Sequence, residues 1–486
     1  MAETYDAVIV GGGHNGLTCG AYLARAGLKT PVLERRPVIG GAAVSEEIVR
    51  GFIFSVFSYV MSLLHPKAIR ELELKAHGFA VLPASDLFCP LPDGNHVVLS
   101  DSVERTQASF ARFSRRDAEV FPAFNRYLGE TTNVVRRLLL ETPIDPSGRG
   151  WRHFRRNAEF LWRYRTVGDR FYRTVDLMTM SADAYLSRWF ESEVVKAVLA
   201  YYSGIGTFAG PRTPGSAYVI MHHLMGEHAG AGGWGFIPGG MGTISKAIAR
   251  SGETHGMAVR TDAEVASIDV AGGRVTGVTT GDGATIRASV VASNASCKVT
   301  FLKLVPEAAL PADFVRDVRN YRTFSTAFKV NIACERLPAY RAFEAATCGF
   351  PYPSYTHIGP TIDYLKKAFQ DAREGWWSKD PFVTPVTPTV VDTTIVPPGK
   401  HVVHLFGGHA PYALRNATWE NERDRFAADV LKKMDEYAPG FTSGIVGMQV
   451  LAPKPAASCM RIAPLIALPS ASSKVAASIL PAARAT

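Results

Sequence analysis

The fold is decided by the stretch Tyr5-Asp6-Ala7-Val8-Ile9-Val10-Gly11-Gly12-Gly13-His14-Asn15-Gly16. Its apolar first half predicts a short buried strand, and the residues from Leu17 to Ala26 that follow it predict a helix. Between the two elements, Gly11 permits a tight turn, Gly13 lets the backbone approach a pyrophosphate, and Gly16 lets the helix pack closely on the sheet. The start of the helix would then offer free N–H groups to phosphates.

A second strand is expected from Lys29 to Glu34, after Gly27 ends the helix. It closes with Glu34, about 20 residues beyond the glycines, where a carboxylate can accept hydrogen bonds from a ribose. Strand, glycine turn, helix and terminal acid together predict a dinucleotide-binding site. A glycine loop that served only as a turn would leave the position of Glu34 unexplained. FAD and NAD both stay open at this point, because they share the adenosine diphosphate half.

Two basic residues and a second pair of glycines come directly after the ribose acid. We interpret this pair as a second close approach of the backbone to the cofactor, with a plain surface turn as the alternative. The predicted cofactor-binding residues up to this point are Gly11, Gly13, His14, Asn15, Gly16, Glu34, Arg35, Arg36, Gly40, Gly41 and Ala42.

Length and composition describe a globular protein of two or three domains. The 486 residues are 47% hydrophobic and 20% charged, and no apolar run reaches the roughly 18 residues of a membrane-spanning helix. The N-terminus runs straight into the first strand, without room for a targeting segment, so we expect a cytoplasmic protein, soluble or peripheral to a membrane. The net charge of +9 favours anionic partners.

The six cysteines are scattered and include no Cys-x-x-Cys pair and no metal-ligand spacing. We therefore expect neither a redox dithiol nor a bound metal. These cysteines are Cys19, Cys89, Cys297, Cys334, Cys348 and Cys459.

Arginines and aromatic residues alternate between Arg149 and Arg173. The favoured interpretation is that the aromatic residues face the core while the arginines extend to solvent. Docking on a membrane or on a lipid-like substrate is the alternative, and nucleic acid is not expected. The aromatic residues are Trp151, Phe154, Phe160, Trp162, Tyr164, Phe171 and Tyr172.

The sequence resembles the phytoene desaturase-like flavoproteins, and within them the branch named for pyridine nucleotide-disulphide oxidoreductase domain-containing protein 2. The resemblance rests first on two stretches, Val8 to Leu17 and Glu34 to Ala43. The others are Leu91 to Leu99, Trp189 to Ser192, Gly210 to Gly215, Trp234 to Gly242, Ala292 to Ala295 and Trp419 to Asn421. It covers the chain from Tyr5 to Leu451.

The resemblance implies an FAD-dependent oxidoreductase, with the backbone of Val265 against the adenine and Gly239 to Gly242 as a second cofactor contribution. A loop before a helix, without a ligand, is the alternative for Gly239 to Gly242. The implied reaction is hydride transfer to or from a small hydrophobic substrate of isoprenoid or lipid-like type, by saturation, desaturation or isomerisation. Without a cysteine pair, the disulphide chemistry in the branch name is not expected. The electron acceptor stays open, and eukaryotic relatives are mitochondrial.

No catalytic residue can be identified from the sequence. His14 lies in the phosphate loop, where local hydrogen bonding is as good an interpretation as a chemical role. Of the neighbours His222 and His223, at most one would face a substrate cavity. An apolar pocket or ordinary core is open for the aromatic residues Tyr201, Tyr202 and Phe208, together with Met221, Met225, Trp234 and Phe236.

The expected fold is α/β, with a Rossmann-type FAD-binding domain interleaved with an α+β substrate domain. A hairpin is predicted from the segments Ala266 to Val270, Arg274 to Thr279 and Thr285 to Ala292. The proline-rich stretch from Asp380 to Pro398 is interpreted as an extended connection rather than core. The FAD-binding domain would take residues 1–95, 230–305 and 400–455, and the substrate domain 96–229 and 306–399.

Beyond Leu451 the resemblance ends without the glycine-rich closing motif expected for the flavin end of FAD. A shifted reading frame near Pro453 is favoured, with a divergent, disordered tail at 456–486 as the alternative. This leaves two rivals to an FAD enzyme: a non-catalytic regulatory or scaffold protein that retains the fold, and a truncated, inactive homologue. An NAD-only dehydrogenase is disfavoured by the two further glycine regions.

Overall fold

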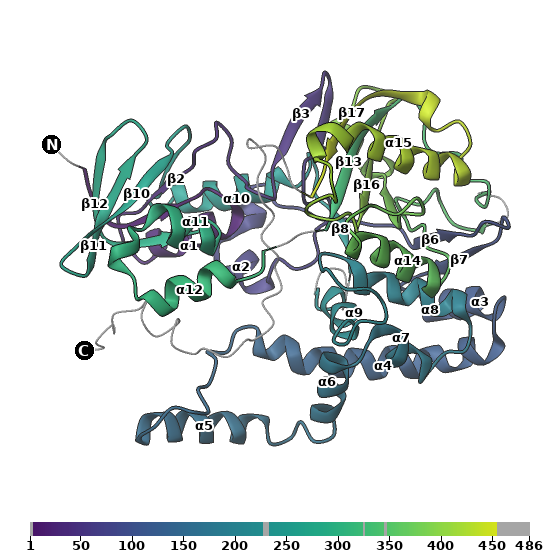
Figure 1. Ribbon diagram of the computed structural model, residues 1–486, viewed down its shortest axis with the longest axis horizontal. Coiled ribbons are helices and arrows are strands. Elements are labelled where there is room, and N and C mark those ends of the chain that lie inside the picture. Colours follow the sequence, from purple (N-terminus) through teal and green to yellow (C-terminus); the bar gives the residue numbers. More distant parts are fainter. Residues whose placement is uncertain (1–2, 227–232, 324–325, 345–347, 454–486) are drawn as a thin grey trace.

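The computed structural model describes residues 3–226, 233–323, 326–344 and 348–453. The predicted tail at 456–486, its reading frame and Cys459 lie outside these residues. Two sheets, on opposite sides of the molecule in Figure 1, organise the described chain.

The first sheet has the strand that precedes the glycine loop near its middle. Its six strands, in spatial order, are β10 (Val265–Ala271), β11 (Arg274–Thr280), β12 (Thr285–Ser293), β1 (Glu3–Val10), β2 (Pro31–Leu33) and β9 (Ala258–Arg260). β1 runs parallel to both β12 and β2, so the carboxyl ends of these three strands meet at one edge. The predicted first strand, second strand and hairpin are all present.

Two helices, α1 (His14–Arg25) and α10 (Gly242–Glu253), pack together beside this sheet. A Cβ atom at Gly20 of α1 would lie 2.9 Å from Val32 and 2.7 Å from Met257, so the close contact of helix and sheet needs a residue without a side chain. The chain from Val259 to Ile268 belongs to two strands, β9 and β10. The chain breaks between them at Asp262, whose φ of +51° does not fit a strand.

The second sheet is larger and almost entirely antiparallel. Its seven strands, in spatial order, are β17 (Ile445–Leu451), β13 (Phe328–Cys334), β16 (His401–Gly407), β15 (Val383–Val386), β14 (Tyr355–Thr356), β6 (Leu87–Pro90) and β7 (His96–Leu99). Helix α15 (Trp419–Tyr437) packs on it through Phe426, whose ring stands edge-on to Phe328 at 4.7 Å. Helix α14 (Ile362–Arg373) lies below α15 in the view of Figure 1.

Two expectations are corrected by this second sheet. The stretch from Asp380 to Pro398 is not an extended connection, because β15 lies within it, is fully buried and pairs with β16. Residues 400–455, expected in the FAD-binding domain, contribute β16 and β17 to the second sheet instead. Both strands pair with β13 along its length, which leaves them no place in the first sheet.

Helices, one short hairpin and one short pair of strands from distant parts of the sequence complete the described chain. The helices between β7 and β8 are α3 (Val103–Ala111), α4 (Arg115–Leu138), α5 (Trp151–Tyr164), α6 (Arg170–Thr179), α7 (Ala182–Ser187), α8 (Glu193–Ala200) and α9 (Ala217–His223). The remaining elements are β3 (Ser45–Val49) with β4 (Phe52–Ser55), β5 (Leu82–Pro83) with β8 (Gly235–Phe236), α2 (Pro66–Glu71), α11 (Cys297–Val299) and α12 (Ala312–Asn320). Helix α5 stands away from the body of the molecule in Figure 1, and the β3–β4 hairpin projects from its top.

The chain passes between the two sheets more than once. It leaves the first sheet after β2, builds β6, β7 and the helices up to α9, returns for β9 to β12, and then completes the second sheet. The predicted α/β fold with two interleaved parts is therefore confirmed. Interleaving places residues that are far apart in sequence beside the glycine loop.

One buried histidine makes the stability of this fold sensitive to acid. His357, just after β14, is 1% exposed, stacks on Tyr201 at 4.1 Å between ring centroids and has no hydrogen-bond partner for either ring nitrogen among the described residues. Burial lowers the pKa of His357 from 6.5 to about 3.

We predict that His357→Leu reduces the loss of stability in acid. Between pH 6.5 and pH 3 the unfolded chain binds a proton at His357 that the folded chain does not, so the free energy of unfolding falls as the pH falls. From pH 6.5 to pH 5 this one histidine contributes a loss of about 2 kcal/mol. Urea unfolding at both pH values measures the difference. The same loss in the variant and in the parent would contradict the prediction, and His255→Leu, at an exposed position, is the control.

Candidate functional site

The glycine loop is closed by backbone contacts that only glycines permit. Gly11 has a φ of +96° and donates from its N–H to the carbonyl of Leu33 at 2.8 Å. A Cβ atom at Gly16 would lie 2.2 Å from the carbonyl oxygen of Gly11. Such an approach is impossible without moving the loop, so the predicted roles of both glycines are consistent with the structure.

The N-terminus of α1 is open, in contrast to that of α10. Gly13 precedes α1 in an extended conformation, and no side chain caps the helix and no acid lies in its first turn. At α10, Ser55 Oγ accepts from Met241 N at 3.0 Å and Ser45 Oγ accepts from Gly242 N at 2.8 Å. The first helix can therefore bind a diphosphate through its N–H groups and dipole, whereas these two amides of the second already have protein partners.

Glu34 ties the end of β2 to the glycine loop. Its Oε2 accepts from Gly12 N at 2.8 Å, and its Oε1 accepts from Arg36 N at 3.0 Å. A Cβ atom at Gly12 would lie 2.9 Å from the Glu34 Cβ, so this contact also needs a glycine. Each carboxylate oxygen keeps a free lone pair, which suits two ribose hydroxyls.

The second glycine pair lies against the first loop. Gly40 has a φ of +128° and donates to the carbonyl of Gly12 at 2.8 Å, while Gly41 has a φ of +60°. The carbonyl of Ala42 accepts from Ser58 N at 2.9 Å. This hydrogen bond connects the residues after the second glycine pair to the segment that follows β4.

The other predicted cofactor residues are spread around this loop. Val265 is buried at the start of β10, and Ala263 two residues earlier donates to the carbonyl of Glu34 at 2.9 Å. Arg36 is held by Glu46 in an ion pair of 2.6 Å, and Arg35 is exposed. Asn15 is exposed on the first turn of α1.

Asn294 is a residue that the sequence analysis did not assign to the site. It follows β12, its N–H donates to the carbonyl of Val10 at 2.8 Å, and its Nδ2 lies 2.6 Å from the point where a Cβ of Gly13 would be. The parallel pairing of β1 with β12 brings it there, because the carboxyl ends of both strands meet at one edge. The sequence predicted both strands, but it did not predict how the residues of β1 and β12 align, so Asn294 could not be placed beside Gly13.

A group of buried polar side chains lies beside the segment that follows β4. Its members are Lys329, Asn331 and His404, and it is called the polar group below. Lys329 of β13 is 4% exposed; its Nζ donates to the carbonyls of Ser55 and Phe57 and lies 5.1 Å from the ring centroid of Tyr59. Burial lowers the pKa of the Lys329 ammonium well below its usual range.

Asn331 and His404 extend this polar group along the second sheet. Asn331 Oδ1 and His404 Nδ1 are 2.8 Å apart, and Asn331 Nδ2 donates to the carbonyl of Val56 at 3.1 Å. Burial, and secondarily the charge of Lys329, lowers the pKa of His404. A lysine and a histidine, both with lowered pKa values, therefore lie close together in the interior.

A cavity of about 210 Å³ is linked to the polar group through two tyrosines, Tyr355 in its wall and Tyr59 beside Lys329. Tyr355 in its wall is hydrogen-bonded through its hydroxyl to that of Tyr59. The lining residues are Ala84, Ser85, Asp86, Leu87, Leu99, Ser100, Asp101, Phe121, Phe124, Asn125, Leu128, Leu199, Tyr202, Ile220, Leu224, Trp234 and Tyr355. Aromatic and aliphatic side chains thus form one part of the cavity wall, and polar groups form a part that exposes nearly as much surface.

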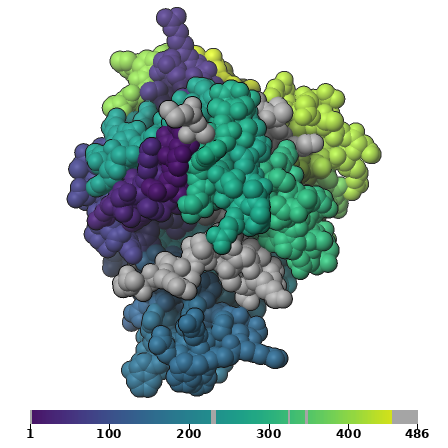
Figure 2. Space-filling model, turned by 90° about the vertical axis from the view of Figure 1, so that its left-hand side faces the viewer, coloured from purple at the N-terminus to yellow at the C-terminus, as the bar shows by residue number. Residues whose placement is uncertain are grey.

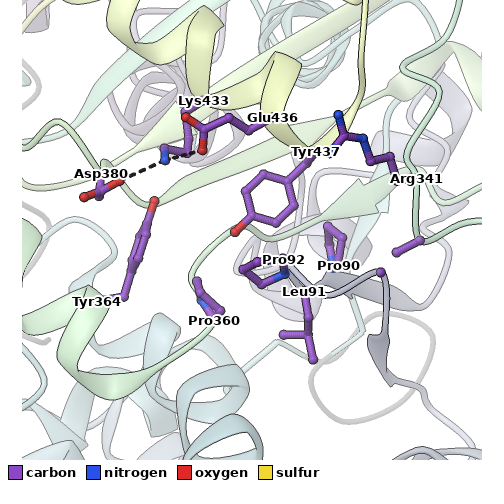
Figure 3. A pocket seen from close by; sticks show the side chains of 12 residues that line it. Pro90, Leu91, Pro92, Arg341, Pro360, Tyr364, Asp380, Lys433, Glu436 and Tyr437 are labelled. Carbon is purple, nitrogen blue, oxygen red and sulfur yellow. Dashed lines mark hydrogen bonds and ion pairs between the residues drawn. The ribbon is translucent and has the colours of Figure 1, made fainter.

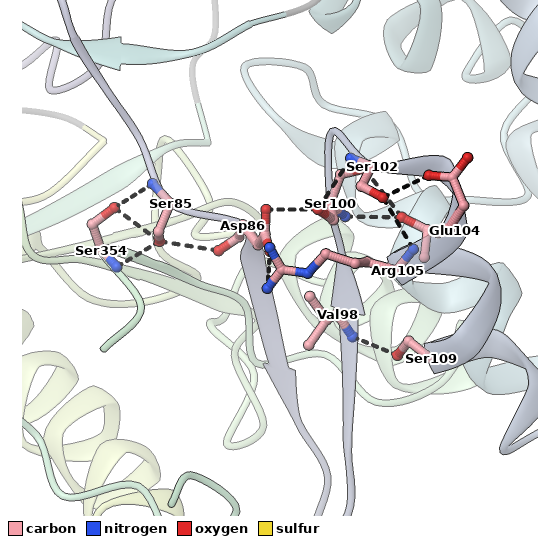
Figure 4. A network of polar contacts seen from close by, with 10 residues as sticks. Ser85, Asp86, Val98, Ser100, Ser102, Glu104, Arg105, Ser109 and Ser354 are labelled. Carbon is pink, nitrogen blue, oxygen red and sulfur yellow. Dashed lines mark hydrogen bonds and ion pairs between the residues drawn. The ribbon is translucent and has the colours of Figure 1, made fainter. Parts of the chain in front are cut away.

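The polar patch of the cavity is held by its own contacts (Figure 4). Asp86 accepts from Ser100 Oγ at 2.8 Å and forms an ion pair with Arg105 at 3.0 Å. Burial, and secondarily the nearby Asp86, raises the pKa of Asp101. The ion pair of Asp86 with Arg105 and the raised pKa of Asp101 both reduce the capacity of this patch to bind a cation.

From the sequence, the aromatic residues between Tyr201 and Phe236 could either line a pocket or belong to the core, and the structure shows both. Tyr202 and Trp234 line the cavity, while Tyr201, Met221, Met225 and Phe236 are buried in the core. Phe208 is exposed.

The two adjacent histidines differ, as expected. Their rings are perpendicular, at an interplanar angle of 90°. His223 lies behind the cavity wall, where it stacks on Trp234 and its Nδ1 contacts the Val219 carbonyl at 2.8 Å, and burial lowers its pKa to about 4. His14 in the phosphate loop is half-buried, and burial lowers its pKa as well.

A second pocket, of about 370 Å³, lies between α15 and the turn that joins β6 to β7 (Figure 3). Lys433 in its wall is paired with Asp380 at 2.8 Å and with Glu436 at 2.5 Å. Neither glycine region contributes to this pocket, so we do not connect it with the cofactor.

Fold and site together define a dinucleotide-binding oxidoreductase. The model of the flavin containing amine oxidoreductase family matches residues 16–349. The chain belongs to this family, and its cofactor is FAD. The five cysteines within the described residues are all free, so they form no disulphide with one another.

Three relatives and two solved structures show what the chain is similar to. Pyridine nucleotide-disulfide oxidoreductase domain-containing protein 2 of Rattus norvegicus is 38% identical over 478 residues, which cover 93% of this chain and 82% of that protein. A limonene dehydrogenase polypeptide of Castellaniella defragrans is 26% identical (90% and 79% covered), and the chloroplastic prolycopene isomerase of Daucus carota is 24% identical (93% and 70%). The resemblance to phytoene desaturase-like flavoproteins is thereby confirmed.

The two solved structures agree in fold. An oxidoreductase from Methanosarcina mazei superposes with a TM-score of 0.57 at 16% identity, covering 92% of this chain and 88% of that one. A putrescine oxidase superposes with a TM-score of 0.57 at 14% identity, covering 93% and 85%. None of the helices in the described part of this chain is long and apolar enough to cross a membrane.

We predict that Gly16→Ala abolishes retention of FAD. The added methyl group meets the Gly11 carbonyl at 2.2 Å, so the loop must open, with a loss of about 1–3 kcal/mol in the free energy of unfolding. Flavin absorbance of the purified protein and urea unfolding measure the two effects. Gly129→Ala in α4 is the matched control, because open space surrounds that helical glycine. Normal flavin content in Gly16→Ala would contradict the assignment of the loop.

Proposed function

We propose that the chain is an FAD-dependent oxidoreductase that acts by hydride transfer on a small hydrophobic substrate bound in the cavity of about 210 Å³. The observation that carries the proposal is the continuity of the site. Ala42 contacts Ser58, Phe57 next to it accepts from Lys329, and Tyr59 links that lysine to the cavity wall at Tyr355.

The residues present fit FAD. Gly11, Gly13 and Gly16 leave the start of α1 open for the diphosphate, and Glu34 has free lone pairs for the ribose. Val265, proposed for the adenine, comes two residues after Ala263, which contacts Glu34. Bound FAD supplies the two-electron chemistry by taking up a hydride from a C–H bond or returning one.

The cavity favours an uncharged substrate. Phe121, Phe124 and Leu128 of α4 face Tyr202 and Trp234 across it, and such walls exclude water from a reacting C–H bond. A cavity of about 150 Å³ can bind benzene, so one of this size suits a single monoterpene better than a carotenoid. Two relatives are named for the hydrocarbons limonene and prolycopene.

The polar group of the second sheet supplies the hydrogen-bonding end of the site. Lys329 is held between two carbonyls and the face of Tyr59, so its Nζ position is fixed. The lowered pKa of Lys329 makes its proton easier to release than that of an ordinary lysine, which suits a group that holds or moves a proton.

An amine substrate is the second candidate, because Asp86 and Asp101 lie in the cavity wall. Asp86 is already paired with Arg105, so it does not provide a free carboxylate for a cationic amine. A non-catalytic regulatory or scaffold protein is the third candidate and would bind FAD without reducing it.

We predict that limonene, mixed anaerobically with the flavin-containing protein, bleaches the visible flavin absorbance and that putrescine does not. Leu224→Trp should slow the bleaching by about tenfold or more without loss of FAD, because the larger side chain narrows the cavity. Leu63→Trp, at an exposed leucine outside the cavity, is the control.

Bleaching by putrescine alone would favour the amine oxidase reaction. A stable flavin that neither compound reduces would favour the non-catalytic protein. Equal rates in Leu224→Trp and in the parent would remove the cavity from the proposal.

A further inference from the structure

Helix α5 (Trp151–Tyr164) exposes side chains that proteins normally bury. Trp151, Phe154, Leu161 and Trp162 are 72%, 63%, 67% and 68% exposed, and none of the helix's residues is buried. Our favoured interpretation of this segment, with its aromatic residues in the core, is wrong for these side chains. Their exposure needs another explanation.

The four side chains lie on one face of the helix. Their spacing of three, seven and one residues brings them within about one third of the helical circumference. On the opposite face, Phe160 and Tyr164 are half-buried and contact each other within the helix at 4.6 Å between ring centroids, and Asn157 Nδ2 donates to the carbonyl of Asp145 in the preceding loop at 3.2 Å. The apolar face is therefore the one turned to solvent, and the half-buried side chains lie on the other side of the helix.

The segment around this face is strongly basic. Residues 149–173 contain eight arginines and two carboxylates, which gives a net formal charge of +6. Arg152, Arg155, Arg156 and Arg163 lie to one side of the apolar face. Arg165 lies over the ring of Trp162 at 3.9 Å. Aromatic residues with adjoining arginines are typical of helices that lie in a membrane interface.

The apolar surface continues on α6 (Arg170–Thr179). Phe171 and Tyr172 are exposed, and Val175 and Met178 are also above one third exposed. Ten of the eighteen large hydrophobic side chains exposed among the described residues fall between 139 and 178. The surface is thus concentrated in one projecting part of the molecule, the blue lobe at the bottom of Figure 2.

We propose that α5 and α6 dock this protein on an anionic phospholipid bilayer. The surface is a projecting helix, not a groove, so it suits a broad, soft layer better than the cleft of a partner (Figure 1). The positive charge matches anionic headgroups, and indole rings favour the headgroup boundary. The helix lies in the interface and does not cross the bilayer, since its 14 residues are too few to span it.

Docking also bears on access to the cavity, although it does not depend on the proposed reaction. Helix α4, which contributes Phe121, Phe124 and Leu128 to the cavity, leads directly into the segment that ends in α5. A docked molecule would hold this helix near the lipid, which is where a hydrophobic substrate accumulates.

The test is co-sedimentation of the full-length flavin-containing protein with vesicles of phosphatidylcholine, alone or mixed with phosphatidylglycerol. We expect binding to the mixed vesicles that weakens as salt is raised. The combined variant Trp151→Ala, Phe154→Ala, Leu161→Ala and Trp162→Ala should bind about tenfold or more weakly. Arg152→Gln with Arg156→Gln should weaken binding to the mixed vesicles and reduce its salt dependence.

Folding of the variants is checked by their FAD content and thermal midpoint, which should not change because none of the replaced side chains is buried. Phe208→Ala, at an exposed aromatic residue outside this surface, is the matched control and should bind like the parent. No binding to either vesicle, or equal binding by the four-residue variant and the parent, would overturn the proposal. Self-association that the four-residue variant abolishes, without vesicle binding, would assign the surface to a second copy instead.

Discussion

The structure depends on one steric constraint, the close meeting of the carboxyl ends of β1 and β12 with the start of α1. Gly16 lies against the Gly11 carbonyl, Gly13 lies against the Asn294 side chain, and Gly12 lies against Glu34. A side chain at any of these three glycines would push the elements apart. Because the loop is this tight, the first N–H groups of α1 stay open and the carboxylate of Glu34 is held beside them.

The two sheets contribute different parts of the same site. The first sheet provides an open helix N-terminus and a ribose acid, which suit the adenosine diphosphate half of FAD. The second sheet provides Lys329, Asn331 and His404, whose polar atoms meet in the interior. The segment from Ala42 to Tyr59 joins these two regions and reaches the aromatic cavity. Interleaving of the chain makes this arrangement possible.

Local patterns predicted the first sheet well, because glycines, apolar runs and the position of Glu34 report contacts between neighbours in sequence. The polar group was not predictable, since β13 pairs with β16 and β17 across more than 60 residues. The sequence also does not show how distant strands align, so Asn294 was missed and β15 was interpreted as lying outside the core. On α5 the pattern of aromatic residues showed a helix face but not which way it points, and the structure turns that face outward.

The most direct measurement is the visible spectrum of bound FAD in Lys329→Met, compared with the parent and with Lys433→Met, a buried lysine of the other pocket. If the polar group of the second sheet faces the flavin, the variant retains FAD through the glycine loop but its absorption bands shift, because a polar group beside the ring system is lost. The spectrum of Lys433→Met should stay that of the parent. Identical spectra in all three proteins would contradict the claim that one cofactor extends from the glycine loop to Lys329.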